Sequence, residues 1–461
     1  MKYSKFFNPT LEKLKPKIHT WLKFLRIRLK KQFQITILIL ATFLSILCIS
    51  ILPALTQEKS VTIQVLIQAL EASFWEPIQA DFNKIHPNIN LEIVKGPNDT
   101  NLVEDLYTSS FLLGDSPYDL VYMDIVWVPK FAAANWLKDL SEKVDIQELK
   151  KIYLQGDVAG GIYHNKLYRM PLNSGGGMLY YRTDLLKKAG FKPPNTFAEI
   201  TKISQELQKQ GLVEWGYVWQ GKQYEGLSAM FIEILEGYGG FWVNLETNEV
   251  GLDKPEAIEA VDFLRKTISQ GISPPGVTTY AEEDTRRLFE SGNTVFLRNW
   301  PYVYPLASAS KIAGNFDIKP MVHVPGKNSG ACLGGWGLGI AKTTKHPEEA
   351  WQVIQYFNQP EVQRKFILET GFVPARKSLF NDPTLVEKFP YLPNLFPVVN
   401  NSVLRPPIPQ YAQASDILQR YLSAALTGSR TPELAMKAAA RETRVLLTGR
   451  RSQETGLTRQ N

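Results

Sequence analysis

In the first part of the folded body, the spacing of hydrophobic residues changes repeatedly between the alternation typical of a strand and the spacing typical of a helix. Residues 61–67 alternate and then turn apolar, which predicts a strand that enters a sheet. Apolar residues at helical spacing follow over 74–85 and end before His86-Pro87, where a helix should stop. The same reading predicts a strand at 89–94, a helix at 101–113 and a strand at 118–124. This order is typical of a parallel α/β sheet, whose ligands lie beyond the carboxyl ends of its strands.

The stretch MPLNSGGGMLYYR, residues 170–182, interrupts this pattern. Pro171 and the three glycines Gly175 to Gly177 prevent any regular element there, whereas Met178 to Tyr181 reads as a short buried strand. We therefore predict that the chain first crosses from one lobe to another at this point, with a cleft beside the crossing.

The remainder of the chain is predicted to be mostly helical. A capping box at Thr196–Glu199 opens a helix to about Gln210. Further helices are predicted over residues 226–235, 255–270, 281–291, 346–358, 361–370 and 432–447, with a short strand at 294–297. The glycine-rich stretch at 334–340 predicts a second crossing, and the stretch GFVPAR at 371–376 predicts a third.

The N-terminal segment combines a basic region with an apolar run. Residues 35–55 carry no charge and follow a stretch with many lysines and arginines, which predicts an orientation with the N-terminus inside and the body outside. The run has about the length of a membrane span. Ala54-x-Thr56 also fits a signal-peptide cleavage site. An uncleaved anchor and a cleaved signal both remain open, and either places the body in the periplasm.

Charge and cysteine content argue against several classes of function for the body. The chain has 52 Lys/Arg against 45 Asp/Glu, yet the excess of positive charge comes from residues 1–56, and the body is slightly negative. The basic composition therefore gives no argument for nucleic-acid binding by the body. The two cysteines, Cys48 and Cys332, supply neither a disulfide framework nor a metal site for it.

No catalytic or cofactor motif stands out. The five histidines have no metal-ligand spacing, and neither a Walker loop nor a Gly-x-Ser-x-Gly elbow occurs, so we expect no metal, no cofactor and no catalytic residues. A pair of carboxylates that would make a glycosidase stays an alternative, although nothing in the sequence pairs two of them.

Aromatic residues recur beside planar polar residues at predicted loop tips. Sugars suit such sites, because their C–H faces lie on aromatic rings and their hydroxyls need in-plane donors and acceptors. The combinations are Glu71 near Trp75, Asp124 near Trp127, Trp219-Gln220 with Tyr224-Glu225, Asn299-Trp300-Pro301-Tyr302, and Gly334-Gly335-Trp336. Asn98, like Glu71 and Asp124, follows a predicted strand end.

Several of these segments resemble, in order, the carbohydrate-binding extracellular solute-binding proteins (family 1) of ABC importers, most of all the trehalose/maltose-type branch found in cyanobacteria. The resemblance covers about residues 60–445 and rests on YDLVYMDIVWVPKFAAANWLKDL, MPLNSGGGMLYYRTDLLKKAG, YVWQGKQYEGL, LRNWPY, LGGWGLGIAK and GFVPARKSL.

The resemblance implies an α/β fold of the two-lobed periplasmic-binding-protein type (type II), with a hinge of three crossovers and sugar bound between the lobes. The expected divisions are 1–34 (basic region), 35–56 (signal or anchor), 57–170 with 336–372 (first lobe), 171–335 with 373–447 (second lobe) and 448–461 (polar tail).

The resemblance also implies roles for individual residues. Glu71 and Asp124 would accept sugar hydroxyls, Trp300, Tyr302 and Trp336 would be stacking platforms, Gly335 would give backbone contacts and Arg376 would be a donor. Asn98, Gln220, Tyr224 and Glu225 would line the same site. Relatives often carry an acid where this chain has Gly175, so one hydroxyl contact is expected to be lost or replaced.

We therefore expect a monomeric receptor for a disaccharide-sized glycoside of the trehalose, maltose, sucrose or glucosylglycerol type. It would close around the sugar and deliver it to ABC permease subunits, held at the cytoplasmic membrane if residues 35–55 stay attached. A membrane-anchored sugar sensor is the first alternative, and a cleft glycosidase is the second. We expect Asp124→Ala to weaken sugar binding without lowering stability.

Overall fold

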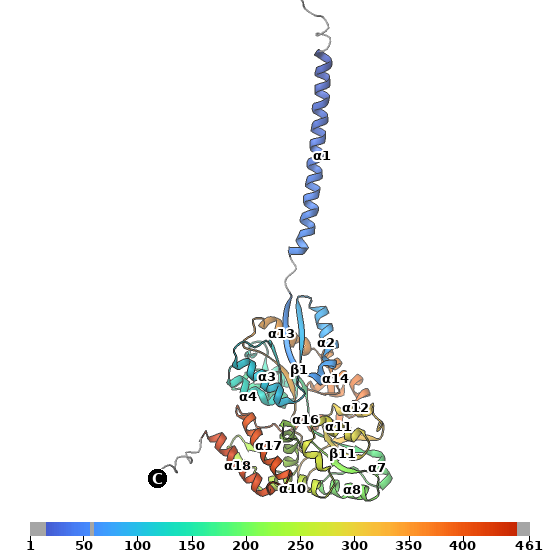
Figure 1. Cartoon of the computed structure of the whole chain (residues 1–461), viewed down its shortest axis with the longest axis vertical. Coiled ribbons are helices and arrows are strands. Elements are labelled where there is room, and N and C mark those ends of the chain that lie inside the picture. The colour runs from blue at the N-terminus through green and yellow to red at the C-terminus, as the bar shows by residue number, and fades with distance from the viewer. Residues whose placement is uncertain (1–14, 56–59, 450–461) are drawn as a thin grey trace, which may run out of the picture. The chain divides into compact units, whose positions relative to one another are not determined.

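The computed structural model describes residues 15–55 and 60–449 (Figure 1). The chain forms two units, residues 1–60 and residues 61–461, and each is described here by itself. The predicted polar tail at 448–461 falls almost entirely outside the described residues.

The first unit contains one long helix, α1 (Lys15–Leu55). Among the helices of the described residues, none is both long and apolar enough to span a lipid bilayer, so the predicted membrane anchor is not shown. The basic residues of α1 continue to Lys31, and its side chains are described as far as Ser45. The side chains of the predicted cleavage site, Ala54 and Thr56, lie outside the described residues.

The first lobe of the body is built on a six-stranded sheet with the order β14-β6-β13-β3-β1-β2. The strands are β1 (Val61–Gln68), β2 (Ile89–Gly96), β3 (Leu120–Asp124), β6 (Met170–Ser174), β13 (Trp336–Ile340) and β14 (Val373–Pro374). β1 is parallel to β2 and β3, as the predicted order of strands and helices implies, whereas β13 is antiparallel to β3 and β6. The sheet is therefore mixed rather than purely parallel.

The second lobe is built on a four-stranded sheet with the order β12-β7-β11-β8. Its strands are β7 (Met178–Arg182), β8 (Trp215–Val218), β11 (Thr294–Asn299) and β12 (Phe316–Pro320). β7 and β11 follow the predicted strands. β8 and β12 were not predicted, because each is short: β8 has four residues and β12 has five.

The chain crosses between these sheets at the predicted glycines. β6 ends at Ser174 in the first sheet and β7 begins at Met178 in the second, so Gly175 to Gly177 form the first crossing. Residues 171–174 therefore belong to the first sheet, whereas the predicted boundary placed them in the second lobe. The second crossing lies between β12 and β13.

The third crossing comes later in the chain than predicted. β14 still pairs with β6, and Arg376 still pairs with Tyr153, so the chain is within the first lobe at residues 373–376. The third passage runs beside the second one, because Val403 pairs with Cys332 and accepts a hydrogen bond from Leu333 N at 2.8 Å.

Helices cover both sheets (Figure 1). Those that pack with the first sheet or its neighbours are α2 (Ala72–Ile85), α3 (Thr100–Leu112), α4 (Val128–Ala133), α5 (Ile146–Ile152), α6 (Gln155–Ala159), α13 (Pro347–Phe357) and α14 (Pro360–Thr370). Those around the second sheet are α7 (Thr183–Ala189), α8 (Phe197–Lys209), α9 (Glu225–Gly237), α10 (Pro255–Ser269), α11 (Glu282–Glu290), α12 (Val303–Ser308), α17 (Tyr411–Leu426) and α18 (Pro432–Thr448). Between the two groups lie α15 (Pro383–Lys388) and α16 (Leu392–Asn400).

Local signals set several of these boundaries. Thr196 and Glu199 form the predicted capping box at the start of α8. Two small hairpins, β4 (Ile162–Tyr163) with β5 (Lys166–Leu167) and β9 (Val243–Asn244) with β10 (Glu249–Val250), lie outside the main sheets.

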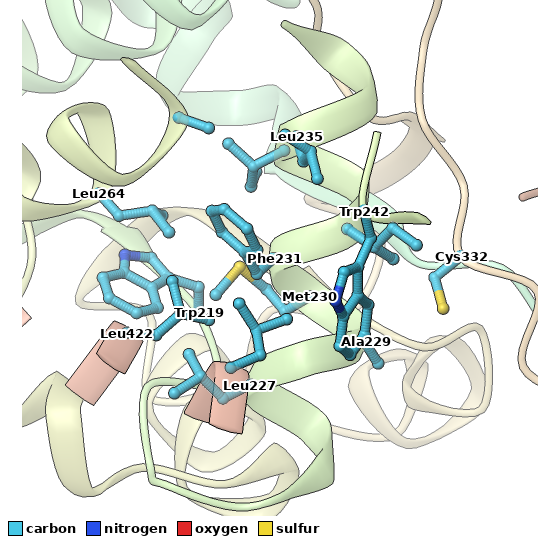
Figure 2. Close-up of a cluster of buried hydrophobic side chains, with 14 of the residues drawn as sticks. Trp219, Leu227, Ala229, Met230, Phe231, Leu235, Trp242, Leu264, Cys332 and Leu422 are labelled. Carbon is cyan, nitrogen blue, oxygen red and sulfur yellow. The ribbon is translucent and has the colours of Figure 1, made fainter. Parts of the chain in front are cut away.

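The core of the second lobe is organised around α9. Its apolar residues pack among Trp219, Trp242, Leu264 and Leu422 (Figure 2). Burying this many large side chains contributes on the order of 2 kcal/mol each. Because α9 is almost wholly buried, the polar groups along it are positioned rigidly.

Candidate ligand-binding cavity

A cavity of about 510 Å³ lies between the two lobes. Its volume is within the usual range for small-molecule sites. From the first lobe it is lined by Gln68, Leu70, Glu71, Asn98, Asp99, Thr100, Asp124, Asn173, Ser174, Trp336, Phe372 and Val373. From the second lobe and the crossings it is lined by Gly175, Lys222, Tyr224, Glu225, Gly226, Ala229, Ala281, Glu282, Glu283, Arg287, Trp300, Pro301, Tyr302, Gly334 and Arg405.

Glu71 lies where β1 leads into α2, and only 3% of it is exposed. Trp75 Nε1 donates to its Oε2 at 3.4 Å. Burial raises the pKa of Glu71 from 4.5 to about 7, and hydrogen bonds from Trp75 and Tyr122 offset only part of that effect. Among the described residues, no cation forms an ion pair with this carboxyl, and none contributes to its pKa.

The loop after β2 contributes Asn98 and Asp99. Asn98 Oδ1 accepts from Leu70 N at 2.9 Å, so this side chain mainly shapes the first-lobe wall. Asp99 caps the start of α3 by accepting from Asn101 N, and it forms an ion pair with Lys222 of the second lobe at 3.0 Å. This loop therefore joins the two walls at one edge of the cavity.

Asp124 and Glu225 lie on opposite walls and share one cation. Arg405 donates from Nη2 to Asp124 Oδ1 and from Nη1 to Glu225 Oε1, both at 2.7 Å. Arg405 is almost fully buried, and its Nε has no hydrogen-bond partner among the described residues. Tyr411 and Ser415 also donate to Glu225. The sequence analysis missed Arg405, because nothing in residues 401–407 marks a site.

Aromatic side chains form the rest of the surface. Trp336 begins β13 and packs against Tyr122 and Trp127, with ring centroids 4.8 and 5.2 Å apart. Trp300 and Tyr302 follow β11 on the opposite wall.

Two consecutive acids at the start of α11 hold these aromatic groups in place. Glu282 accepts from Tyr224 Oη at 2.5 Å and from Trp300 Nε1 at 3.3 Å. Glu283 accepts from Tyr302 Oη at 3.0 Å and is paired with Arg286. Sequence reasoning missed both acids, since on a helical pattern they read as ordinary first-turn residues.

Eight of the predicted site residues line this one cavity: Glu71, Asn98, Asp124, Tyr224, Glu225, Trp300, Tyr302 and Trp336. Gln220, Gly335 and Arg376 are not part of the lining. Gln220 is fully buried and donates to Thr285 Oγ1 and Arg298 O. Arg376 donates to Tyr153 Oη at 3.1 Å and to Asn358 O at 2.8 Å within the first lobe.

Gly335 does not line the cavity and lies next to two buried charged side chains, Asp157 and Arg169. A Cβ at Gly335 would lie 2.5 Å from Asp157 Oδ1, so only glycine fits there. Its carbonyl oxygen accepts from Ile125 N at 3.0 Å.

The structure leaves no room at Gly175 for the acid that the family resemblance suggested there. A Cβ at this position would lie 2.7 Å from the carbonyl oxygen of Gly334, and Gly334 N donates to Gly175 O at 3.1 Å. The first two crossings are therefore too close together here for any side chain. Glu282, Glu283 and Arg405 bring polar groups to the same cavity from other segments.

Within residues 15–55 and 60–449, no group of His, Cys, Asp and Glu side chains is arranged to hold a metal ion. The polar side chains of the cavity are carboxylates, amides, phenols, the hydroxyls of Thr100 and Ser174, and three cations, arranged around aromatic faces.

Comparison with known proteins gives consistent matches. Residues 67–364 match the family described as bacterial extracellular solute-binding protein. The chain is 31% identical over 360 residues to a probable ABC transporter-binding protein of Deinococcus radiodurans, covering 75% of this chain and 84% of that protein.

Solved structures show the same two-lobed fold. Maltose-bound MalE3 of T. maritima has a TM-score of 0.80 and 34% sequence identity, covering 84% of this chain and 100% of that one. An ABC transporter solute-binding protein from Thermotoga lettingae bound with α-D-tagatose has a TM-score of 0.75 and 25% identity, with coverage of 84% and 100%.

Proposed function

This chain belongs to the bacterial extracellular solute-binding proteins, and we propose that it is the sugar-binding component of an ABC importer. It captures a disaccharide or similar glycoside outside the cytoplasmic membrane and delivers it to permease subunits. The relatives named above are binding proteins, and two of the similar structures hold maltose and tagatose. The chain itself hydrolyses nothing, and ATP hydrolysis belongs to a separate subunit.

The observation that carries this proposal is the pairing of aromatic faces with buried carboxylates in one interlobe cavity. Trp300 and Trp336 offer flat apolar surfaces from opposite lobes, suited to the C–H faces of two sugar rings. Glu71, Asp124 and Glu282, which line the cavity, accept hydroxyl donors from the sugar. A volume of about 510 Å³ accommodates a ligand of disaccharide size.

Binding works through closure of the lobes. Groups from both walls contact one ligand, so the ligand binds the closed arrangement more tightly and shifts the equilibrium toward it. Contacts across the cavity edge, such as Lys222 with Asp99 and Arg405 with Asp124, belong to this closed arrangement. The closed surface is what the permease subunits recognise.

A thermal-shift screen tests the proposal. The purified protein is heated with trehalose, maltose, sucrose, glucosylglycerol and monosaccharides, because a ligand that binds only the folded state raises the melting temperature. We expect a clear shift with at least one disaccharide-sized glycoside and smaller shifts with monosaccharides. The absence of a shift with every sugar would contradict the proposed function.

A further inference from the structure

Glu233 of α9 is a buried carboxylate that collects hydrogen bonds from three separate segments. Arg298 of β11 donates to it twice, from Nε to Oε2 at 2.7 Å and from Nη2 to Oε1 at 2.5 Å. Gly177 N and Cys332 N donate to the same Oε1 at 3.0 and 3.3 Å. Both side chains of the ion pair are wholly buried.

Two of these donors belong to the crossings between the lobes. Gly177 is the last residue before β7, and Cys332 lies in the passage from β12 to β13. A Cβ at Gly177 would lie 2.0 Å from Glu233 Oε1, so the first crossing is held directly against the carboxylate. One side chain therefore fixes the second-lobe ends of two crossings.

Arg298, the other member of the ion pair, contacts a residue that lines the cavity. The Arg298 guanidinium carbon lies 4.2 Å from the centre of the Trp300 ring, and Trp300 lines the cavity. Arg298 Nη1 donates to Gln220 Oε1 at 3.0 Å, which keeps the guanidinium plane in one orientation. Gln220 does not line the cavity, but through this hydrogen bond it supports Arg298, which contacts the Trp300 ring.

The second crossing also touches the platform itself. A Cβ at Gly334 would lie 3.0 Å from the Trp300 ring, two residues after Cys332. Trp300 therefore contacts the second crossing directly at Gly334, and it reaches Cys332 and Gly177 through Arg298 and Glu233.

A gain in stability alone does not explain the buried ion pair of Glu233 with Arg298. Replacing a buried ion pair by apolar side chains of similar size is often neutral or stabilising, whereas removing one partner is strongly destabilising. A bidentate guanidinium–carboxylate pair does, however, fix the relative orientation of the groups that it joins.

We propose that Glu233 and Arg298 are positioning residues that couple the sugar platform Trp300 to the first two crossings. The inference deepens the proposed function and rests on it in one respect, that Trp300 carries the sugar. Ligand stacked on Trp300 holds the guanidinium plane, the carboxylate follows it, and the amides of Gly177 and Cys332 stay in the arrangement of the closed lobes. Ligand binding and lobe closure are then linked through these contacts.

The first test uses the protein without sugar. In Glu233→Gln, amide hydrogen exchange in the segments around Gly177 and Cys332 should become at least about tenfold faster than in the wild type. The 19F resonance of fluorotryptophan at position 300, assigned by its loss in Trp300→Phe, should shift in the same variant. A lower melting temperature with unchanged exchange and an unchanged resonance would overturn the proposal.

Two further variants serve as controls. Asp184→Asn breaks the pair of Asp184 with Arg182, which lies in the same lobe and touches neither crossing, so it should leave both readouts unchanged. If Glu233→Gln does not fold, the double variant Glu233→Met/Arg298→Met should fold, because it replaces both charges together. Its crossing amides should still exchange faster than those of the wild type, and wild-type exchange would overturn the proposal.

The second test is a double-mutant cycle on maltose affinity. If Glu233 acts through Trp300, the combined loss in Glu233→Gln/Trp300→Phe should be smaller than the product of the single losses by at least about threefold. Independent, multiplicative losses would contradict the coupling. A wild-type protein that binds no maltose would count against this choice of sugar within the proposed function, and the sugar-free test would then decide the coupling.

Discussion

Glu71 is a carboxyl at the cavity wall whose ionisation opposes folding. Burial raises its pKa from 4.5 to about 7, so the native state favours the neutral form more than the unfolded chain does. Its contribution to stability is therefore fully present below pH 4.5 and is lost as the pH rises through about 7. This one buried carboxyl of the cavity thus lowers the stability of the protein above about pH 7.

Glu71→Gln should remove this dependence. The free energy of unfolding of the variant should match that of the wild type near pH 4.5 and exceed it at pH 8 by on the order of 1–3 kcal/mol. Urea unfolding of both proteins at the two pH values measures the difference, in which the other titrating groups cancel. A difference that is the same at both pH values would mean that the Glu71 carboxyl is not held neutral.

Asp124 shows how a buried partner changes an expectation drawn from sequence. As a strand-end acid it was expected to affect binding and not stability. The structure places it in an ion pair with Arg405, which is 2% exposed.

Asp124→Ala should therefore lower the free energy of unfolding by roughly 3 kcal/mol, because Arg405 loses one of its two carboxylates while it stays buried. Lys222→Ala is the matched control: its ion pair with Asp99 is partly exposed to solvent, unlike that of Asp124 with Arg405, so the loss should stay below about 1 kcal/mol. Chemical denaturation compares the two variants, and equal losses would show that Arg405 does not depend on Asp124.

At the scale of elements, glycine and capping signals were informative and lobe boundaries were not. The three glycines at 175–177 marked the first crossing correctly, since they must pass close to Gly334 and Glu233. The stretch at 371–376 was also interpreted as a crossing, yet β14 and Arg376 still pair within the first lobe. Local sequence cannot reveal this, because both pairs join segments that are far apart in the chain.

The first crossing offers a direct comparison of neighbouring glycines. Gly177→Ala should destabilise the protein by roughly 2 kcal/mol or more, since its Cβ would lie 2.0 Å from Glu233 Oε1 and would disturb a buried ion pair. Gly176→Ala should cost much less, because the nearest atom to its Cβ would be a Val399 methyl carbon at 3.3 Å. Thermal denaturation ranks the two variants, and a similar loss for both would place the constraint in the backbone rather than in Glu233.

At the scale of the whole molecule, the order of motifs predicted more than any single motif did. The two-lobed α/β fold is confirmed by the similar structures, and eight predicted residues meet in one cavity although they are far apart in the sequence. Arg405, Glu282 and Glu283 were missed because their importance comes only from what they contact across the fold. Arg376 was chosen for its place after a supposed crossing, and its hydrogen bonds turn it into the first lobe instead.

The central claim is that the cavity between Trp300 and Trp336 binds one sugar molecule. Calorimetric titration of the wild type with the sugar selected by the thermal-shift screen tests it most directly, together with the same titration of Trp300→Ala. The account predicts one site per chain in the wild type and an affinity about 5- to 150-fold weaker in the variant, which corresponds to roughly 1–3 kcal/mol. Equal affinity in a folded Trp300→Ala protein, or heat from no sugar at all, would contradict it.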